Sequence, residues 1–265
     1  MPPTIFVRRA PLFRGNLVEI ERPDRIEVES LTKLYGDVAA VTDLSFSVGA
    51  GEILGLVGPN GAGKTTTLRS VAGIIPPSGG TIHVAGHDLA EEPVEAKSRL
   101  AFIPDEPQLF DYLNVQEHLR FIGRIYGVEN PEAPIAELLR DWELVDHAKK
   151  LPDQLSRGMR QKLAIACGLL HDPSILLFDE PLTGLDPGSI RRIKSTIRSR
   201  AAAGGAVILS SHLLHLVEEL CDRVLVIQKG RLLFAGTMSE IKDYRPDLEG
   251  EGLEDVFLAL TEGDP

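Results

Sequence analysis

The chain has 265 residues, of which 43% are hydrophobic, and this length fits one large domain or one domain with a subdomain. Its formal net charge of -11 argues against nucleic acid as a partner, because extended contact with phosphates relies on clustered Lys and Arg. The cysteines, Cys167 and Cys221, are far apart in sequence and indicate neither a disulfide framework nor a zinc cluster. Neither a transmembrane run of about 18 apolar residues nor a signal-peptide core occurs, so we expect a cytoplasmic protein.

The first part of the chain predicts an extension followed by a β-rich lobe. Residues 1–24 carry four prolines among mixed charges, which disfavours a helix and predicts an N-terminal extension. From residue 25 to residue 265 we expect one α/β domain. Short apolar or alternating runs predict the strands of its first lobe at residues 26–31, 44–48, 53–57 and 81–84.

The middle of the chain changes to helical character. Apolar spacing over residues 115–126 and 135–144 predicts helices of an inserted helical subdomain, at about residues 98–172. Strand runs then return at residues 175–178, 207–209 and 224–227, separated by helical segments that start near Gly188 and His212. This βαβ alternation predicts a mostly parallel, buried sheet, and therefore the α/β fold class.

The sequence GPNGAGKT follows the predicted strand at residues 53–57 and opens a helical run. A glycine-rich turn lets backbone N–H groups close on phosphate oxygens, Lys64 can reach the β- and γ-phosphates, and Thr65 offers a hydroxyl to Mg²⁺. The alternative is a plain glycine-rich turn with a solvated lysine. We predict a P-loop that binds ATP, with these residues as its binding set: Gly58, Pro59, Asn60, Gly61, Ala62, Gly63, Lys64, Thr65 and Thr66.

Two adjacent acids, Asp179 and Glu180, follow the apolar run at residues 175–178. The carboxyl ends of strands in an open α/β sheet are where ligands bind, so these acids are predicted to lie beside the P-loop. Asp179 would hold Mg²⁺ through water, and Glu180 would polarise the attacking water. The alternative is that they are surface acids at a strand end.

The segment LSRGMRQ at residues 155–161 narrows the choice among P-loop proteins, because it resembles the signature motif of the ATP-binding cassette (ABC) family. This resemblance, which covers most of residues 26–237, implies an ABC nucleotide-binding domain of the P-loop NTPase class. It implies that Ser156 and Gly158 contact the γ-phosphate bound by the opposite subunit. Taken alone, a serine at the start of a helix, such as Ser156, is more often an ordinary N-cap.

Further residues take roles by the same resemblance. Tyr35 would stack on adenine, or else be a half-buried tyrosine at a strand end. Asp186, in TGLDP, would bridge the two subunits. His212 would hydrogen-bond the γ-phosphate and align Glu180, which makes Glu180, His212 and Lys64 the expected catalytic residues. An alternative groups His212, His215 and Glu218 as metal ligands on one helical face.

Two positions depart from the family pattern. The signature usually reads LSGGQ, but Arg157 stands at its first glycine and Met159 at its glutamine. At the Q-loop, in AFIPDEP, Asp105 stands where most members have glutamine, and it is a candidate Mg²⁺ ligand beside Thr65 and Asp179.

We therefore expect a homodimer or paired cassette that encloses two Mg-ATP and drives a separate integral membrane permease from the cytoplasmic face of the membrane. The tail LEDVFLAL at residues 253–260 resembles the end of exporter-type cassettes, or is simply an amphipathic helix. A cluster after Asp105 is a candidate permease contact or core packing: Leu109, Phe110, Tyr112 and Leu113. The alternatives are a soluble ABC-type ATPase in DNA repair, translation or iron–sulfur assembly, and a non-catalytic binding module.

Overall fold

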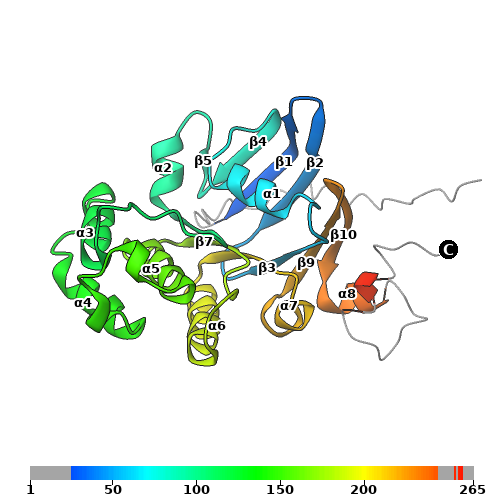
Figure 1. Cartoon of the computed structure of the whole chain (residues 1–265). Helices are drawn as coiled ribbons and strands as arrows, with labels where there is room; N and C mark the ends of the chain where they lie inside the picture. The colour runs from blue at the N-terminus through cyan, green and yellow to red at the C-terminus, as the bar shows by residue number, and fades with distance from the viewer. Residues whose placement is uncertain (1–24, 244–253, 255, 259–265) are drawn as a thin grey trace, which may run out of the picture.

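The structure, a computed structural model, describes residues 25–243, 254 and 256–258, and it has two β-sheets with helices around them (Figure 1). The predicted extension at residues 1–24 lies outside the described residues, as does part of the predicted tail helix. None of the described helices has the length and apolar character needed to cross a membrane.

The N-terminal lobe is a four-stranded antiparallel sheet in the order β2-β1-β4-β5. Ile26 at the start of β1 lies opposite Val48 of β2 and Val84 of β4, and its side chain is fully buried. The predicted strands at residues 26–31, 44–48 and 81–84 are thus confirmed as parts of longer strands. The run at residues 53–57, also predicted for this lobe, instead forms a strand of the second, six-stranded sheet, where all five of its residues are buried. The strands of the lobe are β1 (Ile26–Tyr35), β2 (Val38–Val48), β4 (Gly79–Val84) and β5 (His87–Asp88).

The main sheet has six strands in the order β10-β9-β3-β8-β7-β6. Strand β3 pairs in parallel with β8 and β9, and β7 pairs in parallel with β8 and β6, whereas β10 runs antiparallel to β9. The predicted mostly parallel sheet is therefore confirmed. Its strands are β3 (Ile53–Val57), β6 (Leu100–Ile103), β7 (Ile175–Asp179), β8 (Ala206–Ser210), β9 (Arg223–Gln228) and β10 (Arg231–Thr237).

Strand β6 corrects the predicted start of the helical insertion. The range 98–172 includes this strand, which pairs with β7 from Leu100 opposite Ile175 to Ile103 opposite Phe178. Its four apolar residues are too few for periodicity to distinguish a buried strand from a buried helix. The helices between β6 and β7 begin later, and they are α3 (Val115–Ile125), α4 (Glu132–Asp141) and α5 (Arg157–Leu169), with short 3₁₀ turns at Val145–His147 and Pro152–Gln154.

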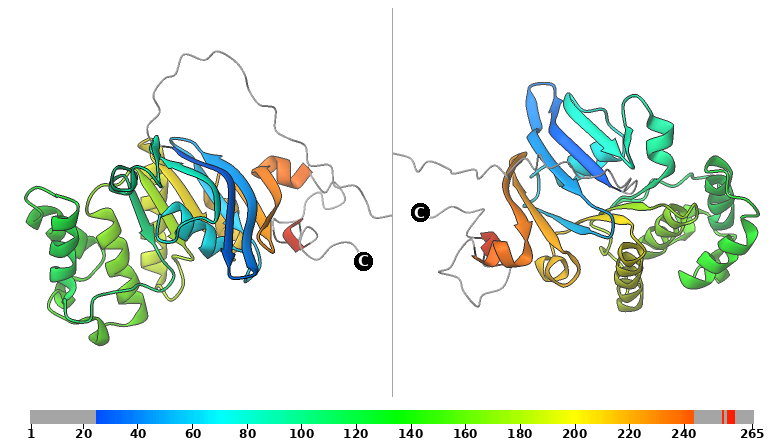
Figure 2. Two further views of the ribbon diagram at one scale, coloured as in Figure 1. Left: turned by 90° about the horizontal axis from the view of Figure 1, so that it is seen from above. Right: turned by 180° about the vertical axis from the view of Figure 1, so that it is seen from behind.

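Both faces of the main sheet are buried, because successive side chains of its strands enter different hydrophobic clusters. On β7, Leu176 and Phe178 pack with helices α5, α6 and α7, whereas Ile175 and Leu177 pack with α1 and the antiparallel sheet. Figures 1 and 2 show this layering, with α3 and α4 at one end of the molecule and α8 at the other. The remaining helices are α1 (Lys64–Val71), α2 (Pro93–Ser98), α6 (Pro187–Ala202), α7 (Leu214–Leu220) and α8 (Met238–Asp243).

Candidate active site

The P-loop connects β3 to α1, as the sequence predicts, and Lys64 is the first residue of the helix. Gly63 precedes it with a φ of 108°, and a Cβ atom there would lie 2.7 Å from the carbonyl oxygen of Ala40. Only glycine fits this left-handed, crowded position without strain. The N-terminus of α1 therefore opens at the carboxyl edge of the main sheet, where its backbone N–H groups can bind an anion.

Lys64 is buried, with 7% of its surface exposed. Its Nζ donates to the carbonyl oxygens of Gly58 at 2.7 Å and Pro59 at 3.3 Å, and lies 4.0 Å from Oε1 of Glu180. Burial lowers the pKa of Lys64, and the charges of Glu180 and Asp179 offset only part of that effect. A buried ammonium group whose nearest carboxylate is this far away suits an incoming phosphate, which would stabilise its charge.

Asp179 ends β7 and is 3% exposed. It lies opposite Ser210, the last residue of β8, whose Oγ donates to Asp179 Oδ1 at 2.7 Å. Ser210 was not among the site residues predicted from the sequence, although His212, two positions later, was. The signal that could have identified Ser210 is its position at the carboxyl end of a buried strand next to the acid-bearing strand.

Glu180 takes a φ of 48°, which is unusual for a residue with a side chain. Its backbone N–H donates to the carbonyl oxygen and to Oγ of Ser210, each at 3.2 Å. Its carboxylate lies between two elements: Oε1 faces Lys64, and Oε2 lies 2.8 Å from Nδ1 of His212 and accepts from the His212 backbone N–H at 3.3 Å. The fold thus fixes both oxygens of this carboxylate beside the P-loop.

His212 lies in the loop between β8 and α7, with 59% of its side chain exposed. Helix α7 begins at Leu214, so His212 does not share a helical face with His215, contrary to the alternative metal site. Among the described residues, no group of three or more His, Cys, Asp or Glu side chains could hold a metal ion. His212 instead lies beside Glu180, as the resemblance implies.

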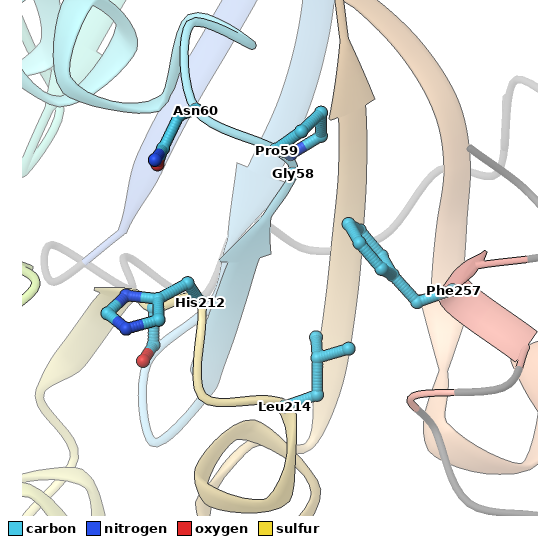
Figure 3. Close-up of a pocket in the computed structure, with 7 residues that line it drawn as sticks. Gly58, Pro59, Asn60, His212, Leu214 and Phe257 are labelled. Atoms are coloured by element: carbon cyan, nitrogen blue, oxygen red, sulfur yellow. The ribbon is translucent and has the colours of Figure 1, made fainter. Parts of the chain in front are cut away.

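A cavity of about 290 Å³ adjoins the P-loop and the His212 loop. Figure 3 shows that Phe257 extends toward it from the opposite side to His212, with Leu214 nearby. Residues 254 and 256–258 of the predicted tail helix are helical, and Val256 and Phe257 pack on the main hydrophobic cluster. The cavity is lined by Gly58, Pro59, Asn60, Ser211, His212, Leu214 and Phe257.

The signature segment, residues 155–161, contains the start of α5, whose first residue is Arg157. Ser156 is exposed and is the N-cap of α5, where its side chain accepts from the backbone N–H of Met159 at 3.2 Å. A Cβ atom at Gly158 would lie 2.8 Å from the carbonyl oxygen of Gly184, so glycine is needed there because the two segments touch. The ordinary N-cap role of Ser156 is therefore observed, and its phosphate contact stays a prediction.

Asp186 is the N-cap of α6, where it accepts from the Ser189 backbone N–H at 2.9 Å and from Ser189 Oγ at 2.7 Å. Lys162 Nζ lies 3.0 Å from Asp186 Oδ2, the oxygen that also accepts from Ser189 Oγ. The hydrogen bonds from Ser189, together with the one from Lys162, hold the pKa of Asp186 well below its usual range. The charged Asp186 side chain thus links the loop after β7 to Lys162 of α5.

Asp105 and Tyr35 complete the set of predicted residues. Asp105 follows β6, and its Oδ1 accepts from Nη2 of Arg157 at 3.0 Å. Tyr35 ends β1 with 50% of its surface exposed, and Lys33 Nζ lies 5.3 Å from its ring centroid. The metal role of Asp105 and the adenine role of Tyr35 stay predictions.

A family model described as "ABC transporter" matches residues 41–183, which is more than half of the chain. The chain belongs to the ABC transporter family. It is 37% identical, over 88% of its length and 77% of the relative, to the linearmycin resistance ATP-binding protein LnrL of Bacillus subtilis (strain 168). It is 36% identical, over 89% of its length and 75% of the relative, to the Nod factor export ATP-binding protein I of Cupriavidus pinatubonensis (strain JMP 134 / LMG 1197).

A solved ABC structure agrees with the fold. The structure titled "Structure of ATP binding subunit of ABC transporter" superposes with a TM-score of 0.84 at 33% identity, covering 89% of this chain and 98% of that one. The predicted ABC nucleotide-binding fold is therefore confirmed, and the chain is an ATP-binding subunit with ATPase activity. These matches are to transporter proteins, and they do not favour the soluble alternative.

Proposed function

We propose that this ABC subunit hydrolyses ATP between two copies of itself, or between itself and a similar cassette, and thereby drives export through a separate membrane permease. The observation that carries this proposal is the position of Glu180. Its carboxylate is fixed between Lys64 and His212, at the edge of the sheet where the P-loop opens. A charged carboxylate held there can act on a water molecule near the terminal phosphate.

The residues present fit ATP and Mg²⁺. The amides of the P-loop and the buried ammonium group of Lys64 would hold the phosphates, and Thr65 with Asp179 would hold the metal. When bound, Mg²⁺ neutralises charge on the phosphate oxygens. Asp179 is 3% exposed and one of its oxygens accepts from Ser210 Oγ, so the site orients this carboxylate before any ligand arrives.

Glu180 would orient the attacking water and draw a proton from it, and His212 would keep the Glu180 side chain in that orientation. The contact of 2.8 Å between His212 Nδ1 and Glu180 Oε2 supports this pairing. Because 59% of the His212 side chain is exposed, its ring remains accessible to the γ-phosphate of a bound nucleotide. Hydrolysis is then a matter of positioning and electrostatics rather than of covalent chemistry.

The second half of each site would come from the other subunit. Ser156 is exposed at the N-terminus of α5, where a hydroxyl and helix amides can bind the γ-phosphate held by the opposite P-loop. Asp186, at the N-terminus of α6, would cross the same interface. Each subunit would thus supply a P-loop to one site and a signature motif to the other. Each site is therefore completed by the partner subunit.

Permease docking is proposed at the segment between β6 and α3. Phe110 is 53% exposed and Tyr112 is 92% exposed, and the Phe110 ring packs edge-on against Phe121 of α3 with ring centroids 5.0 Å apart. Exposed aromatic residues held in place by packing are typical anchors of protein interfaces. A permease at this surface would place the subunit on the cytoplasmic face of the membrane.

Export is supported by the tail and by one relative. The tail helix carries Val256, which is 1% exposed and buried in the main cluster, so this segment is an integrated part of the domain. The relative from Cupriavidus pinatubonensis is named as an export protein. We propose the same direction of transport, export, for this chain, and the proposal does not include the cargo of that relative.

The proposal is tested by purifying the full chain with its membrane partner from the native membrane fraction in detergent. We expect Phe110→Ala to reduce the amount of membrane protein recovered while ATP binding by the isolated chain stays unchanged. Leu232→Ala is the matched control, because Leu232 is an exposed apolar residue on β10, at the other edge of the main sheet. If Phe110→Ala and Leu232→Ala recover equal amounts of the membrane protein, the proposed docking surface is contradicted. If the wild-type chain recovers no membrane protein, the transporter function is contradicted.

A further inference from the structure

The two charged departures from the family's motif pattern are bonded to each other. Nη2 of Arg157 donates to Oδ1 of Asp105 at 3.0 Å, although the residues are 52 positions apart. By the resemblance, the signature position usually holds glycine and the Q-loop position glutamine, and neither residue carries a charge. In this chain both positions are charged, and each charge neutralises the other.

The pair joins the signature helix to the segment that follows β6. Arg157 is the first residue of α5, directly after the N-cap Ser156. One turn along the same helix face, Gln161 is 1% exposed and donates from Nε2 to the carbonyl oxygen of Pro104 at 3.1 Å. Helix α5 is therefore attached to adjacent residues, Pro104 and Asp105, at two successive turns.

The stem of Arg157 is also packed. A Cβ atom at Gly184 would lie 3.3 Å from Cδ of Arg157 and 3.6 Å from its Cγ, so the side chain crosses the backbone of the loop before Asp186 on its way to Asp105. This contact limits the freedom of a side chain that is still 49% exposed. Ordinary surface ion pairs lack such bracing, and many of them contribute little.

We propose that Arg157 is a positioning residue for the signature motif and that Asp105 is its anchor. The pair holds the N-terminus of α5 so that Ser156 and Gly158 meet the γ-phosphate in the opposite subunit's site. This inference rests on the proposed function, in which those two residues face the partner's ATP. A glycine at residue 157 could not make this link, because it has no side chain to reach Asp105.

The proposal is tested with a double-mutant cycle on the full chain, using Arg157→Gln, Asp105→Asn and both together. We expect each single variant to lower kcat for ATP hydrolysis about two- to five-fold, the range of a half-exposed ion pair, and the double variant to lower it no further. The Kd for ATP at the P-loop, measured with a fluorescent ATP analogue, and the Mg²⁺ concentration for half-maximal rate should stay at wild-type values.

Arg120→Gln is the matched control. It breaks the Arg120–Glu132 ion pair, which has similar exposure and joins α3 to the start of α4, far along the chain from the signature motif. We expect this variant to retain wild-type kcat. A fall in kcat equal to that of Arg157→Gln would overturn the proposal, because a general loss of stability in the helical insertion would then explain both.

Three other results would also overturn the proposal. If Asp105→Asn keeps full activity while Arg157→Gln loses it, Arg157 acts on the phosphate directly. If Asp105→Asn raises the Mg²⁺ requirement, Asp105 acts on the metal. If the two effects multiply in the double variant, the residues act independently. Failure of the wild-type chain itself to hydrolyse ATP would instead refute the proposed function.

Discussion

The candidate site has two halves: a P-loop half, with Lys64, Asp179 and Glu180, and a signature half, with Ser156 and Gly158. The two differ in how completely a single chain forms them. Lys64 and Asp179 are 7% and 3% exposed, and their polar atoms already contact backbone carbonyl oxygens or Ser210. Ser156 is exposed, and the Asp105–Arg157 pair beside it is half exposed. Burial organises the first half within one chain, whereas the second half is a surface that needs an opposing subunit.

The largest effect of a substitution is expected in the P-loop half. Lys64→Ala removes an ammonium group that would hydrogen-bond charged phosphate oxygens, so the affinity for ATP should fall roughly 100-fold. Isothermal titration calorimetry of the purified chain measures this loss, with circular dichroism as the check on folding. Retention of wild-type affinity would mean that the P-loop amides alone hold the nucleotide.

The signature half should respond differently. In Gly158→Ala the new methyl group would lie 2.8 Å from the Gly184 carbonyl oxygen, so the segments must separate and kcat should fall roughly tenfold. The Kd for ATP should remain unchanged, because the P-loop is not touched. Gly168→Ala on the same helix is the control, since its methyl group would meet only side-chain atoms, at 3.3 Å or more. A weaker Kd in Gly158→Ala would contradict the separation of the two halves.

The smallest effect is expected at Tyr35, which lies on the antiparallel sheet, outside both halves. Stacking on adenine is worth about 1 kcal/mol by analogy with other aromatic pairs, so Tyr35→Ala should raise the KM for ATP about five-fold with little change in kcat. Steady-state kinetics compare it with Tyr112→Ala, which removes a ring that is 92% exposed. An unchanged KM in Tyr35→Ala would remove it from the adenine site.

Local sequence patterns predicted the P-loop half well. The run at residues 53–57 is strand β3, the glycine-rich turn leads into α1, and the run at residues 175–178 became a strand that ends at Asp179. These signals work because a strand buried on both faces is continuously apolar and a phosphate loop has fixed glycine spacing. The α/β class followed from them, whereas the ABC fold was expected from the resemblance of residues 155–161 to the family's signature motif.

What the sequence could not predict depends on contacts between distant segments. The four apolar residues of β6 become a strand only because β7 lies beside them. The Arg157–Asp105 pair joins positions 52 apart, and the hydrogen bond from Ser210 to Asp179 requires β8 next to β7. The predicted helix near His212 begins at Leu214, because the preceding loop turns His212 toward Glu180.

We expect Glu180 to activate water in the P-loop half and to contribute little to nucleotide binding. Glu180→Gln keeps the size of the side chain but removes its negative charge, so hydrolysis should fall about 100-fold or more while Mg-ATP still binds at the P-loop. Because slow hydrolysis should prolong the closed state, this variant with Mg-ATP should elute as a dimer in size-exclusion chromatography, whereas Lys64→Ala should elute as a monomer. The direct measurement is kcat of Glu180→Gln at saturating Mg-ATP. We expect near-complete loss of hydrolysis with a wild-type Kd for ATP, and near-normal hydrolysis would show that Glu180 does not activate the water.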